Sequence, residues 1–557
     1  MSVQPTNKMK KRLNIVIMPL LLVLVGWILI NLTGAALIDS KKYEAMANQQ
    51  QFGSIPIHAN RGTIYDVNGK TLASSNTVYN IIFDPATFRK NDEDKLDLIK
   101  KEMKELFDIP EETMQEKSEI KGSGEGYQVI KKKVDKPQAD ALTKFCNEND
   151  VNCLYSVQDT RRYYPQNELA ANVIGFLDSD GAGQYGLEAY YDDYLAGVDG
   201  RIISAKTANG EEMPYRYQKT FDAQDGNSLY LTIDSTLQHY LEKNLSEAVT
   251  TYNVENRASG IIMNAKTGAI LAMSTEPGFD LNNPAEIFDP RVNEKLGLLT
   301  PEEYKKAYPQ AREQQWKNKA VTEIYYPGSV FKVVTGSAAL EEKVIDTNTK
   351  FACMNMNVFG TSFHCWTKNG HGQQNFVEAM TNSCNPAFIQ IGEKLGKENF
   401  TKYFEAFGLT EKTGIDLPGE VSSLYVPLER MGPVELASSS FGQTNKITPI
   451  QMITAYAATI NGGYLVTPYI TSKITDNNGN VIKSNETEIK RQVISEETSA
   501  IMRSTLESVV NVKGESNANI KGYRIGGKSG TSEKQDENIQ QKRDDLYVSS
   551  YVGFTPA

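Results

Sequence analysis

One nearly unbroken apolar run, from about Leu13 to Leu37, constrains this chain more than any other feature of its sequence. No charged side chain lies between Arg12 and Asp39, and at about 1.5 Å of rise per residue a helix of this length crosses a bilayer. Basic residues precede the run and an acidic residue follows it, so the positive-inside rule places the N-terminus in the cytoplasm. We therefore expect a cytoplasmic tail over 1–12 and a single-pass transmembrane anchor over 13–38 in the cell membrane, with everything after it extracellular.

A cleaved signal peptide is the alternative interpretation of this run. The run is longer than the usual hydrophobic region of about 7 to 15 residues. Thr33-Gly34-Ala35-Ala36 is only a partial match to a cleavage site. We favour the uncleaved anchor.

The composition is that of a globular, multidomain protein. The 557 residues allow roughly two to four domains, and the 40% hydrophobic and 23% charged shares are close to globular averages. The formal net charge of -10 argues against a nucleic-acid partner, which normally requires a basic surface. Five cysteines are too few for a disulfide scaffold, and Cys146 and Cys153 remain open between a disulfide and two buried thiols.

The residues that follow the anchor predict a first domain over 39–222. The stretch from Arg61 to Ala73 has Asn68-Gly69 between two short β-type runs, which is a strong hairpin signal. From about Asp92 to Lys144 the chain is charge-rich with helical spacing, which is typical of solvated helices. A polar stretch from about Asp222 to Asn227 predicts a linker.

Residues 228–557 predict a second domain of α+β class. Two β-rich runs within 259–273 predict an antiparallel hairpin, and helical patterns dominate from about Val330 to Asn461. Strands return near Tyr523–Gly527 and Leu546–Phe554. The predicted order along this domain is strands, then helices, then strands. This order indicates a sheet that is completed by late segments of the chain.

The first of three short motifs is Ser329-Val330-Phe331-Lys332, which follows Pro327-Gly328. If Ser329 opens a helix, the spacing of three places the Lys332 amine beside its hydroxyl. A desolvated lysine is neutral enough to take the proton from a serine hydroxyl, which is otherwise a poor nucleophile. The motif alone is weak evidence, because a helix cap followed by a solvated lysine has the same sequence.

The second motif is Ser383-Cys384-Asn385. In the functional interpretation Ser383 relays a proton between Lys332 and the leaving group, and Asn385 holds the substrate amide. In the structural interpretation both residues are turn formers.

The third motif is Lys528-Ser529-Gly530-Thr531 in an apparent edge strand. Lys528 supplies a positive charge, Gly530 lets the backbone approach a ligand, and Ser529 and Thr531 can donate hydrogen bonds to a carboxylate. The backbone N–H groups of Ser329 and Thr531 would form an oxyanion hole. In this order the three motifs form the S-x-x-K, S-x-N and K-[ST]-G set of the serine acyltransferases that react with penicillin.

With these motifs the sequence resembles a class B penicillin-binding protein over nearly all of the chain after the cytoplasmic tail. The resemblance implies a β-rich pedestal (class B dimerisation-like) domain over 39–222 and a penicillin-binding/serine β-lactamase-like transpeptidase domain over 228–557. The family normally continues into another strand and a C-terminal helix, so we expect a truncated C-terminal end at Ala557. Further stretches that resemble the family are Arg61–Asp66 with Asn68-Gly69, Thr232–Asp234, Gly268–Met273, Phe441–Gln443 and Thr448–Gln451.

The resemblance implies a peptidoglycan D,D-transpeptidase. Ser329 would attack the penultimate D-Ala of a stem peptide that ends in D-Ala-D-Ala, and an amine from a neighbouring stem would resolve the acyl-enzyme. A β-lactam would acylate the same serine. No cofactor is needed for this chemistry, and a polytopic SEDS-type glycosyltransferase and other cell-wall synthesis proteins are the implied partners.

Cys353, Cys365, His371 and Cys384 crowd the stretch between the first and second motifs. Three thiolates and one imidazole make a closed tetrahedral zinc site, so we predict a structural zinc that supports the second motif from behind. Some elongation-type class B proteins resemble this arrangement. Alternatively Cys353 and Cys365 form a disulfide, Cys384 is a small buried residue and His371 a loop residue. His364 is the fifth candidate ligand.

Two other functions share part of this evidence. A serine β-lactamase or β-lactam sensor carries the same three motifs, although the long pedestal-like region and the anchor argue against it. A non-catalytic envelope scaffold is the alternative of another class. The intact Ser329, Lys332, Ser383, Asn385 and Lys528 argue against that scaffold.

Overall fold

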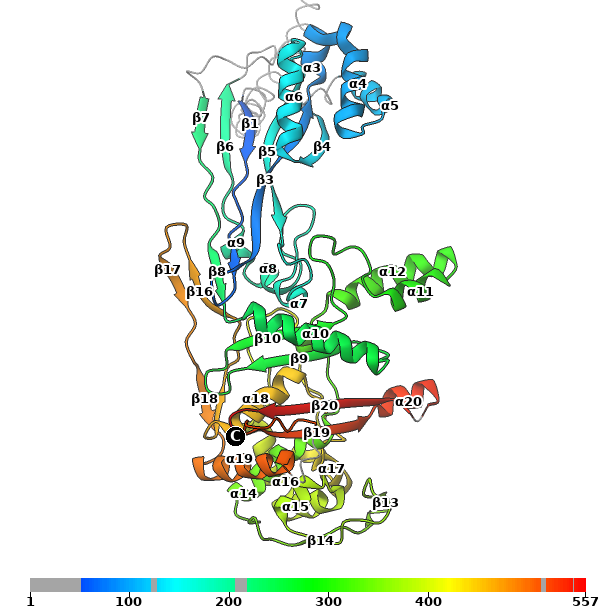
Figure 1. The fold of residues 1–557 in the computed structure, drawn as a ribbon, viewed down its shortest axis with the longest axis vertical. Coiled ribbons are helices and arrows are strands. Elements are labelled where there is room, and N and C mark those ends of the chain that lie inside the picture. Colours follow the sequence, from blue (N-terminus) through cyan, green and yellow to red (C-terminus); the bar gives the residue numbers. More distant parts are fainter. Residues whose placement is uncertain (1–51, 122–127, 206–217, 512–516, 544) are drawn as a thin grey trace, which may run out of the picture. The chain divides into compact units, whose positions relative to one another are not determined.

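The structure, a computed structural model, describes residues 52–121, 128–205, 218–511, 517–543 and 545–557 (Figure 1). Within these ranges no helix combines the length and the apolar character that crossing a membrane requires. The predicted tail over 1–12 and anchor over 13–38 lie outside the described residues, so the transmembrane helix stays a prediction.

The chain divides into two compact units, and each is assembled from three separate stretches of sequence. The first unit takes the described part of 1–59 together with 78–159 and 198–224. The second unit takes 60–77, 160–197 and 225–557.

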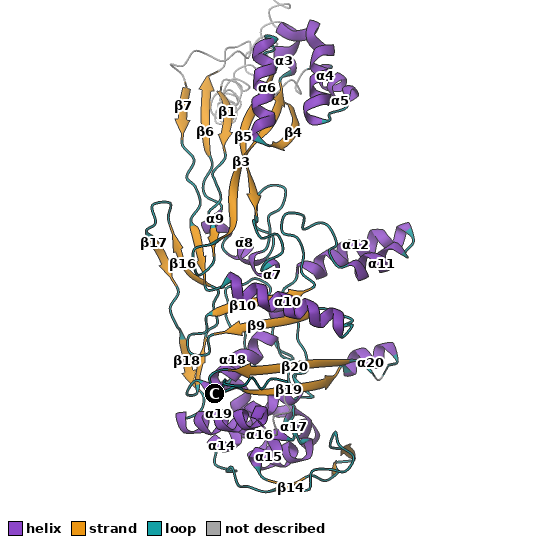
Figure 2. Cartoon of the chain, viewed as in Figure 1, coloured by secondary structure: helices purple, strands orange, loops and turns teal. Residues whose placement is uncertain are grey.

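The first unit combines strands with helices, so the prediction of a β-rich domain is only partly right (Figure 2). Strands β1 and β7 flank β6 in an antiparallel sheet. Ile99, Met103 and Phe107 recur at four-residue spacing, so helix α4 buries one face in a core that also contains Phe83 and Cys153. That amphipathic spacing explains why a charge-rich segment still folds as packed helices.

The elements of this unit are β1 (Phe52–Ile57), α3 (Pro85–Thr87), a π-helical turn (Phe88–Asp92), a 3-10 turn (Glu93–Lys95), α4 (Leu96–Phe107), α5 (Glu111–Ser118), β4 (Gln128–Val134), α6 (Lys136–Glu148), β6 (Gly200–Ala205) and β7 (Gln218–Phe221). Strands β3 (Thr71–Phe83) and β5 (Leu154–Tyr163) contribute residues to both units.

In the second unit, β8 (Ser228–Leu231) pairs with β2 (Ile64–Tyr65) on one side and with β16 (Thr471–Thr475) on the other. The predicted hairpin around Asn68-Gly69 is confirmed, since Ile64 faces Ala73 across β2 and β3. The fully buried carboxylate of Glu188 binds the guanidinium groups of Arg61 and Arg162 at 2.6 Å each. This charge pairing fixes the start of the Arg61–Asp66 stretch inside the unit.

The second predicted hairpin is also confirmed. Strand β9 (Ala258–Met263) pairs antiparallel with β10 (Ile270–Glu276), and a bulge interrupts the register between Ile270 and Ala272. The late strands β19 (Gly526–Glu533) and β20 (Tyr547–Phe554) form another antiparallel pair.

A helical layer packs beside β19 and β20 and carries the largest core of the second unit (Figure 2). Its central helix α14 (Lys332–Glu341) is buried over almost its whole length. Small residues make this packing possible, because a Cβ at Gly336 would already lie 3.0 Å from the ring of Phe376. The helices around α14 are α15 (Phe376–Thr381), α16 (Asn385–Ala406), α17 (Pro433–Ser439), α18 (Pro449–Ile460) and α19 (Glu496–Asn511).

The remaining elements of this unit are α7 (Ala171–Ile174), α8 (Gly186–Tyr190), α9 (Asp192–Leu195), α10 (Ser235–Thr251), α11 (Pro290–Gly297), α12 (Pro301–Trp316), α13 (Lys319–Thr322), β15 (Tyr464–Val466), β17 (Val481–Ser484), β18 (Ile489–Gln492), α20 (Gln535–Gln541) and a 3-10 turn (Leu428–Arg430).

Residues 351–374 interrupt the stretch in which helical patterns dominate. They form four short strands, β11 (Phe351–Ala352), β12 (Met356–Val358), β13 (Thr361–Phe363) and β14 (Gln373–Gln374). Gly360, Gly370 and Gly372 have positive φ in this stretch, a conformation that a helix does not permit.

Candidate active site

Ser329 lies on a 3-10 turn (Gly328–Phe331) directly before helix α14. The regular helix therefore begins at Lys332 and not at Ser329. Gly328 has φ +59 and donates a backbone hydrogen bond of 2.9 Å to Gly442. A Cβ at Gly442 would lie only 2.2 Å from the Gly328 oxygen, so the turn is tightly held. The Ser329 hydroxyl makes no hydrogen bond to any part of the chain that the structure describes, which leaves it free for a substrate.

Lys332 joins the first motif to the second. Its side chain is fully buried, and its amine donates to Asn385 Oδ1 at 2.7 Å, to the Ser383 carbonyl at 2.8 Å and to Ser383 Oγ at 3.2 Å. Burial holds the pKa of Lys332 well below its ordinary value, and the positive charge of Lys528 lowers it further. The nearby sulfur groups of Cys384 and Cys365 oppose part of this lowering of the Lys332 pKa. The three oxygen acceptors orient the amine.

The second motif lies on a strained turn. Ser383 has φ +51, a left-handed conformation that costs a non-glycine residue about 1 to 2 kcal/mol. The turn follows α15, and Cys384 is the N-cap residue of α16, which begins at Asn385. Strain of this kind persists where the surroundings fix the backbone, as three contacts to Lys332 do here.

Strand β19 brings the third motif against the nucleophile turn. A Cβ at Gly530 would lie 2.9 Å from the Pro327 oxygen, and Ser532 Oγ donates to the Tyr326 oxygen at 2.5 Å. Lys528 is 2% exposed, and burial lowers its pKa to about 8. The alternation of the strand places the side chains of Ser529 and Thr531 on the opposite, exposed face.

The structure also brings the four predicted metal ligands together. The donor atoms of Cys353, Cys365, His371 and Cys384 all lie within 4.8 Å of one another, whereas His364 is outside the group. The His371 Nδ1 atom is 3.5 Å from Cys353 Sγ and 3.4 Å from Cys365 Sγ. A tetrahedral zinc site with ordinary bond lengths separates sulfur and nitrogen ligands by about 3.5 Å, so the donor set fits zinc. All five cysteines are free thiols in the structure.

Two polar groups beside these motifs are not predicted by the sequence. The Trp366 indole donates to the Asn382 carbonyl at 3.0 Å, one residue before Ser383. Lys446 pairs with Asp536 of α20, and its amine lies 4.8 Å from the centre of the Tyr326 ring. No local sequence signal marks either contact, because the partners are far apart along the chain.

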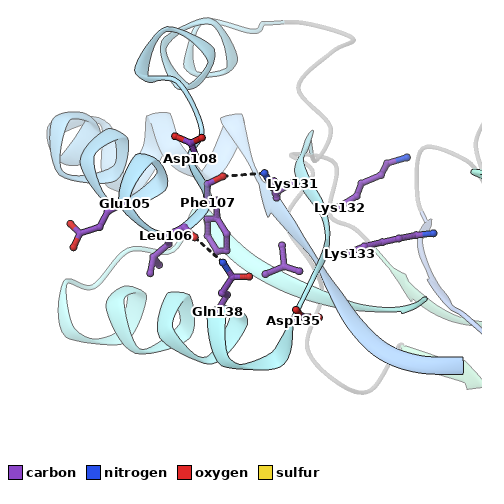
Figure 3. A pocket seen from close by; sticks show the side chains of 10 residues that line it. Glu105, Leu106, Phe107, Asp108, Lys131, Lys132, Lys133, Asp135 and Gln138 are labelled. Atoms are coloured by element: carbon purple, nitrogen blue, oxygen red, sulfur yellow. Dashed lines mark hydrogen bonds between the residues drawn. The ribbon is translucent and has the colours of Figure 1, made fainter. Parts of the chain in front are cut away.

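A pocket of about 300 Å³ lies in the first unit and contains none of the predicted site residues (Figure 3). Lys131 and Gln138 close one side of it by donating to the backbone oxygens of Phe107 and Leu106. Its remaining lining residues are Glu105, Asp108, Lys132, Lys133, Val134 and Asp135. We assign the chemistry to the three motifs and not to this pocket, because no residue of those motifs lines it.

Two family matches cover most of the chain. Residues 258–557 match the penicillin binding protein transpeptidase domain, and residues 56–231 match the penicillin-binding protein dimerisation domain. Stage V sporulation protein D of Bacillus subtilis is 34% identical over 523 residues, which cover 93% of this chain and 76% of that protein. The peptidoglycan D,D-transpeptidase FtsI of Escherichia coli is 24% identical, over 90% of this chain and 76% of FtsI.

Solved structures show the same fold. Penicillin Binding Protein 2X from Streptococcus thermophilus superposes with a TM-score of 0.71 at 23% identity, over 90% of this chain and 74% of that one.

Proposed function

This chain belongs to the class B penicillin-binding proteins and is a peptidoglycan D,D-transpeptidase, and on that basis we propose that Ser329 is the residue that stem peptides and β-lactams acylate. The observation that carries the proposal is the buried Lys332 amine, which contacts both Ser383 and Asn385. A lysine with a lowered pKa serves as a base for the nearby serine, and the shared contacts join two motifs into one site.

Acylation uses each motif in turn. Ser329 Oγ bonds to the carbonyl carbon of the penultimate D-Ala, and the bond from that carbon to the terminal D-Ala nitrogen breaks. The hydroxyl proton passes through Lys332 and Ser383 to the leaving amine. The N–H groups of Ser329 and Thr531 stabilise the oxyanion, and Lys528 with Ser529, Gly530 and Thr531 binds the donor on β19.

Deacylation reverses the roles. The amine of a neighbouring stem bonds to the ester carbonyl, the bond to Ser329 Oγ breaks, and the amine's proton returns to Ser329. A β-lactam acylates in the same way, but its leaving group stays tethered, so its acyl-enzyme is long-lived.

Labelling with a fluorescent penicillin on the full-length protein tests the assignment. We expect one covalent adduct, mapped to Ser329 by mass spectrometry, and none in Ser329→Ala. Lys332→Ala should abolish the adduct while the protein stays folded, because it removes the base. An adduct on another residue would contradict the proposal.

We further propose that Cys353, Cys365, His371 and Cys384 hold a structural zinc. The close approach of the four donor atoms and their thiolate and imidazole chemistry support it. Four protein ligands leave no open position for water, so the metal would supply rigidity and no Lewis-acid step. Because Cys384 stands between Ser383 and Asn385 in sequence, its bond to the metal would restrain the second motif.

The location and partners of the protein are also proposals. The apolar run and its flanking charges support a single-pass anchor over 13–38, a cytoplasmic tail over 1–12 and an extracellular catalytic domain. We propose a pedestal over 39–222 and a transpeptidase domain over 228–557. The pedestal and the anchor would contact a SEDS-type glycosyltransferase.

A further inference from the structure

Trp366 is a large apolar side chain that stays exposed beside the second motif. It is 70% exposed, yet its indole N–H is fixed on the Asn382 carbonyl at 3.0 Å. Its ring also contacts that of His371, with centroids 5.6 Å apart. An indole with a fixed orientation and exposed surface presents a preformed apolar surface.

The segment that carries Trp366 is attached to the active site at two points. Phe363 packs edge-on against Phe441, with ring centroids 6.1 Å apart, and the neighbouring Gly442 accepts the hydrogen bond from Gly328. Trp366 itself binds the residue before Ser383. The indole is therefore positioned relative to both the nucleophile turn and the second motif.

The proposed mechanism decides which part of the substrate lies there. Ser383 passes the proton to the leaving amine during acylation, so the leaving amine lies on the Ser383 side of the ester carbon. The incoming amine of the acceptor attacks from the place that the leaving amine vacated. A side chain bound next to Ser383 therefore borders the acceptor.

We propose that Trp366 is a specificity-determining residue that binds the aliphatic chain of the acyl acceptor, an inference that rests on the proposed role of Ser383. In the step concerned, the acceptor nitrogen bonds to the acyl carbon and the bond to Ser329 Oγ breaks. The nitrogen's proton passes through Ser383 and Lys332 to Ser329. Alkyl carbons next to that nitrogen cover the indole, and each fully covered methylene strengthens binding about fourfold.

The test compares two acceptors on the full-length protein. The donor is a peptide whose C-terminal D-Ala carboxyl is a thioester, so Ser329 is acylated and a thiol leaves. D-alanine or D-norleucine then competes with water for the acyl-enzyme. The side chain of D-norleucine is longer than that of D-alanine by three methylenes. We expect the wild type to prefer D-norleucine. Because the indole covers only one side of the three methylenes, Trp366→Ala should lose about tenfold of that preference. Trp366→Phe, which keeps an aromatic ring but loses the N–H, should retain most of it.

Phe359→Ala is the matched control, because Phe359 is 85% exposed on the turn between β12 and β13 and should leave the preference unchanged. The inference is overturned if Trp366→Ala keeps the wild-type preference for D-norleucine over D-alanine. If penicillin still acylates Ser329 at the wild-type rate in that variant, the proposed function stands. A wild type that penicillin acylates elsewhere overturns the proposed function instead. If Trp366→Ala lowers the melting temperature of the protein, Trp366→Leu is tested in its place, since leucine keeps apolar volume but not the flat ring.

Discussion

The amine of Lys332 donates a hydrogen bond of 2.7 Å to the side-chain oxygen of Asn385, 53 positions later in the chain. This contact and the two to Ser383 place the second motif around the base of the first. The base therefore depends on the neutral amide of Asn385, since an anion in its place would favour the protonated amine.

Replacing Asn385 by aspartate tests that dependence. A carboxylate at the same position would raise the pKa of Lys332, so Asn385→Asp should acylate more than about a hundredfold more slowly at neutral pH and recover partly in alkali. Stopped-flow acylation by a chromogenic β-lactam measures this rate. Asn399→Asp on the same helix α16 is the control, and a wild-type rate in Asn385→Asp would contradict the assigned base.

The two buried lysines predict a bell-shaped pH dependence of acylation. The rate should rise with pH as Lys332 loses its proton at a pKa below the ordinary lysine value. It should fall above a pKa of about 8, where Lys528 loses the charge that binds the donor carboxylate. Measured rates across pH check the profile, and Lys528→Arg should flatten the alkaline limb because arginine keeps its charge.

Gly530 permits the close approach of β19 to the nucleophile turn. The Cβ of Gly530→Ala would meet the Pro327 oxygen at 2.9 Å and the Val330 nitrogen at 3.1 Å, so we expect acylation to slow by about tenfold or more. Gly297→Ala is the control, because nothing lies within 4 Å of a Cβ there. Equal acylation rates in both variants would show that the strand tolerates the displacement.

Elemental analysis of purified protein tests the proposed zinc. We expect about one zinc per chain, lost in Cys365→Ser and His371→Ala and kept in His364→Ala. Cys384→Ser should lower the free energy of unfolding on the order of 3 kcal/mol and slow acylation at the same time. A metal-free protein with a disulfide between Cys353 and Cys365 and full acylation would refute the site.

Reporter fusions after Arg12 and after about Ser54 test the proposed topology. The first fusion should report from the cytoplasm and the second from outside the cell, because the basic flank stays inside. Reports from the same side, or a mature N-terminus near Ala36, would show that the anchor is wrongly assigned.

Local sequence patterns predicted the elements that depend on neighbouring residues. The Asn68-Gly69 turn indicated one hairpin, and the two β-rich runs within 259–273 indicated the other. The order of the three motifs identified the residues that the site brings together. Ser329 differs only in lying on a 3-10 turn and not on a regular helix.

What the sequence could not predict depends on contacts between distant residues. Trp366 looks like any loop tryptophan until Asn382 lies beside it, and Ser532 gives no sign that it binds Tyr326. The short strands within 351–374 have too little apolar periodicity to be distinguished from loop, since their shape follows from glycines and from the gathered Cys and His side chains.

The assembly of each unit from three stretches has a consequence for how the protein is made and cut. Strand β2 pairs with β8, yet Ile64 leaves the ribosome long before its partner Leu229, so the sheet must wait for most of the intervening chain. A recombinant fragment that starts at residue 228 would keep every catalytic side chain but lose Arg61, Arg162 and Glu188. Such a fragment would expose the edge of β8, and we expect it to aggregate unless 60–77 and 160–197 are grafted back.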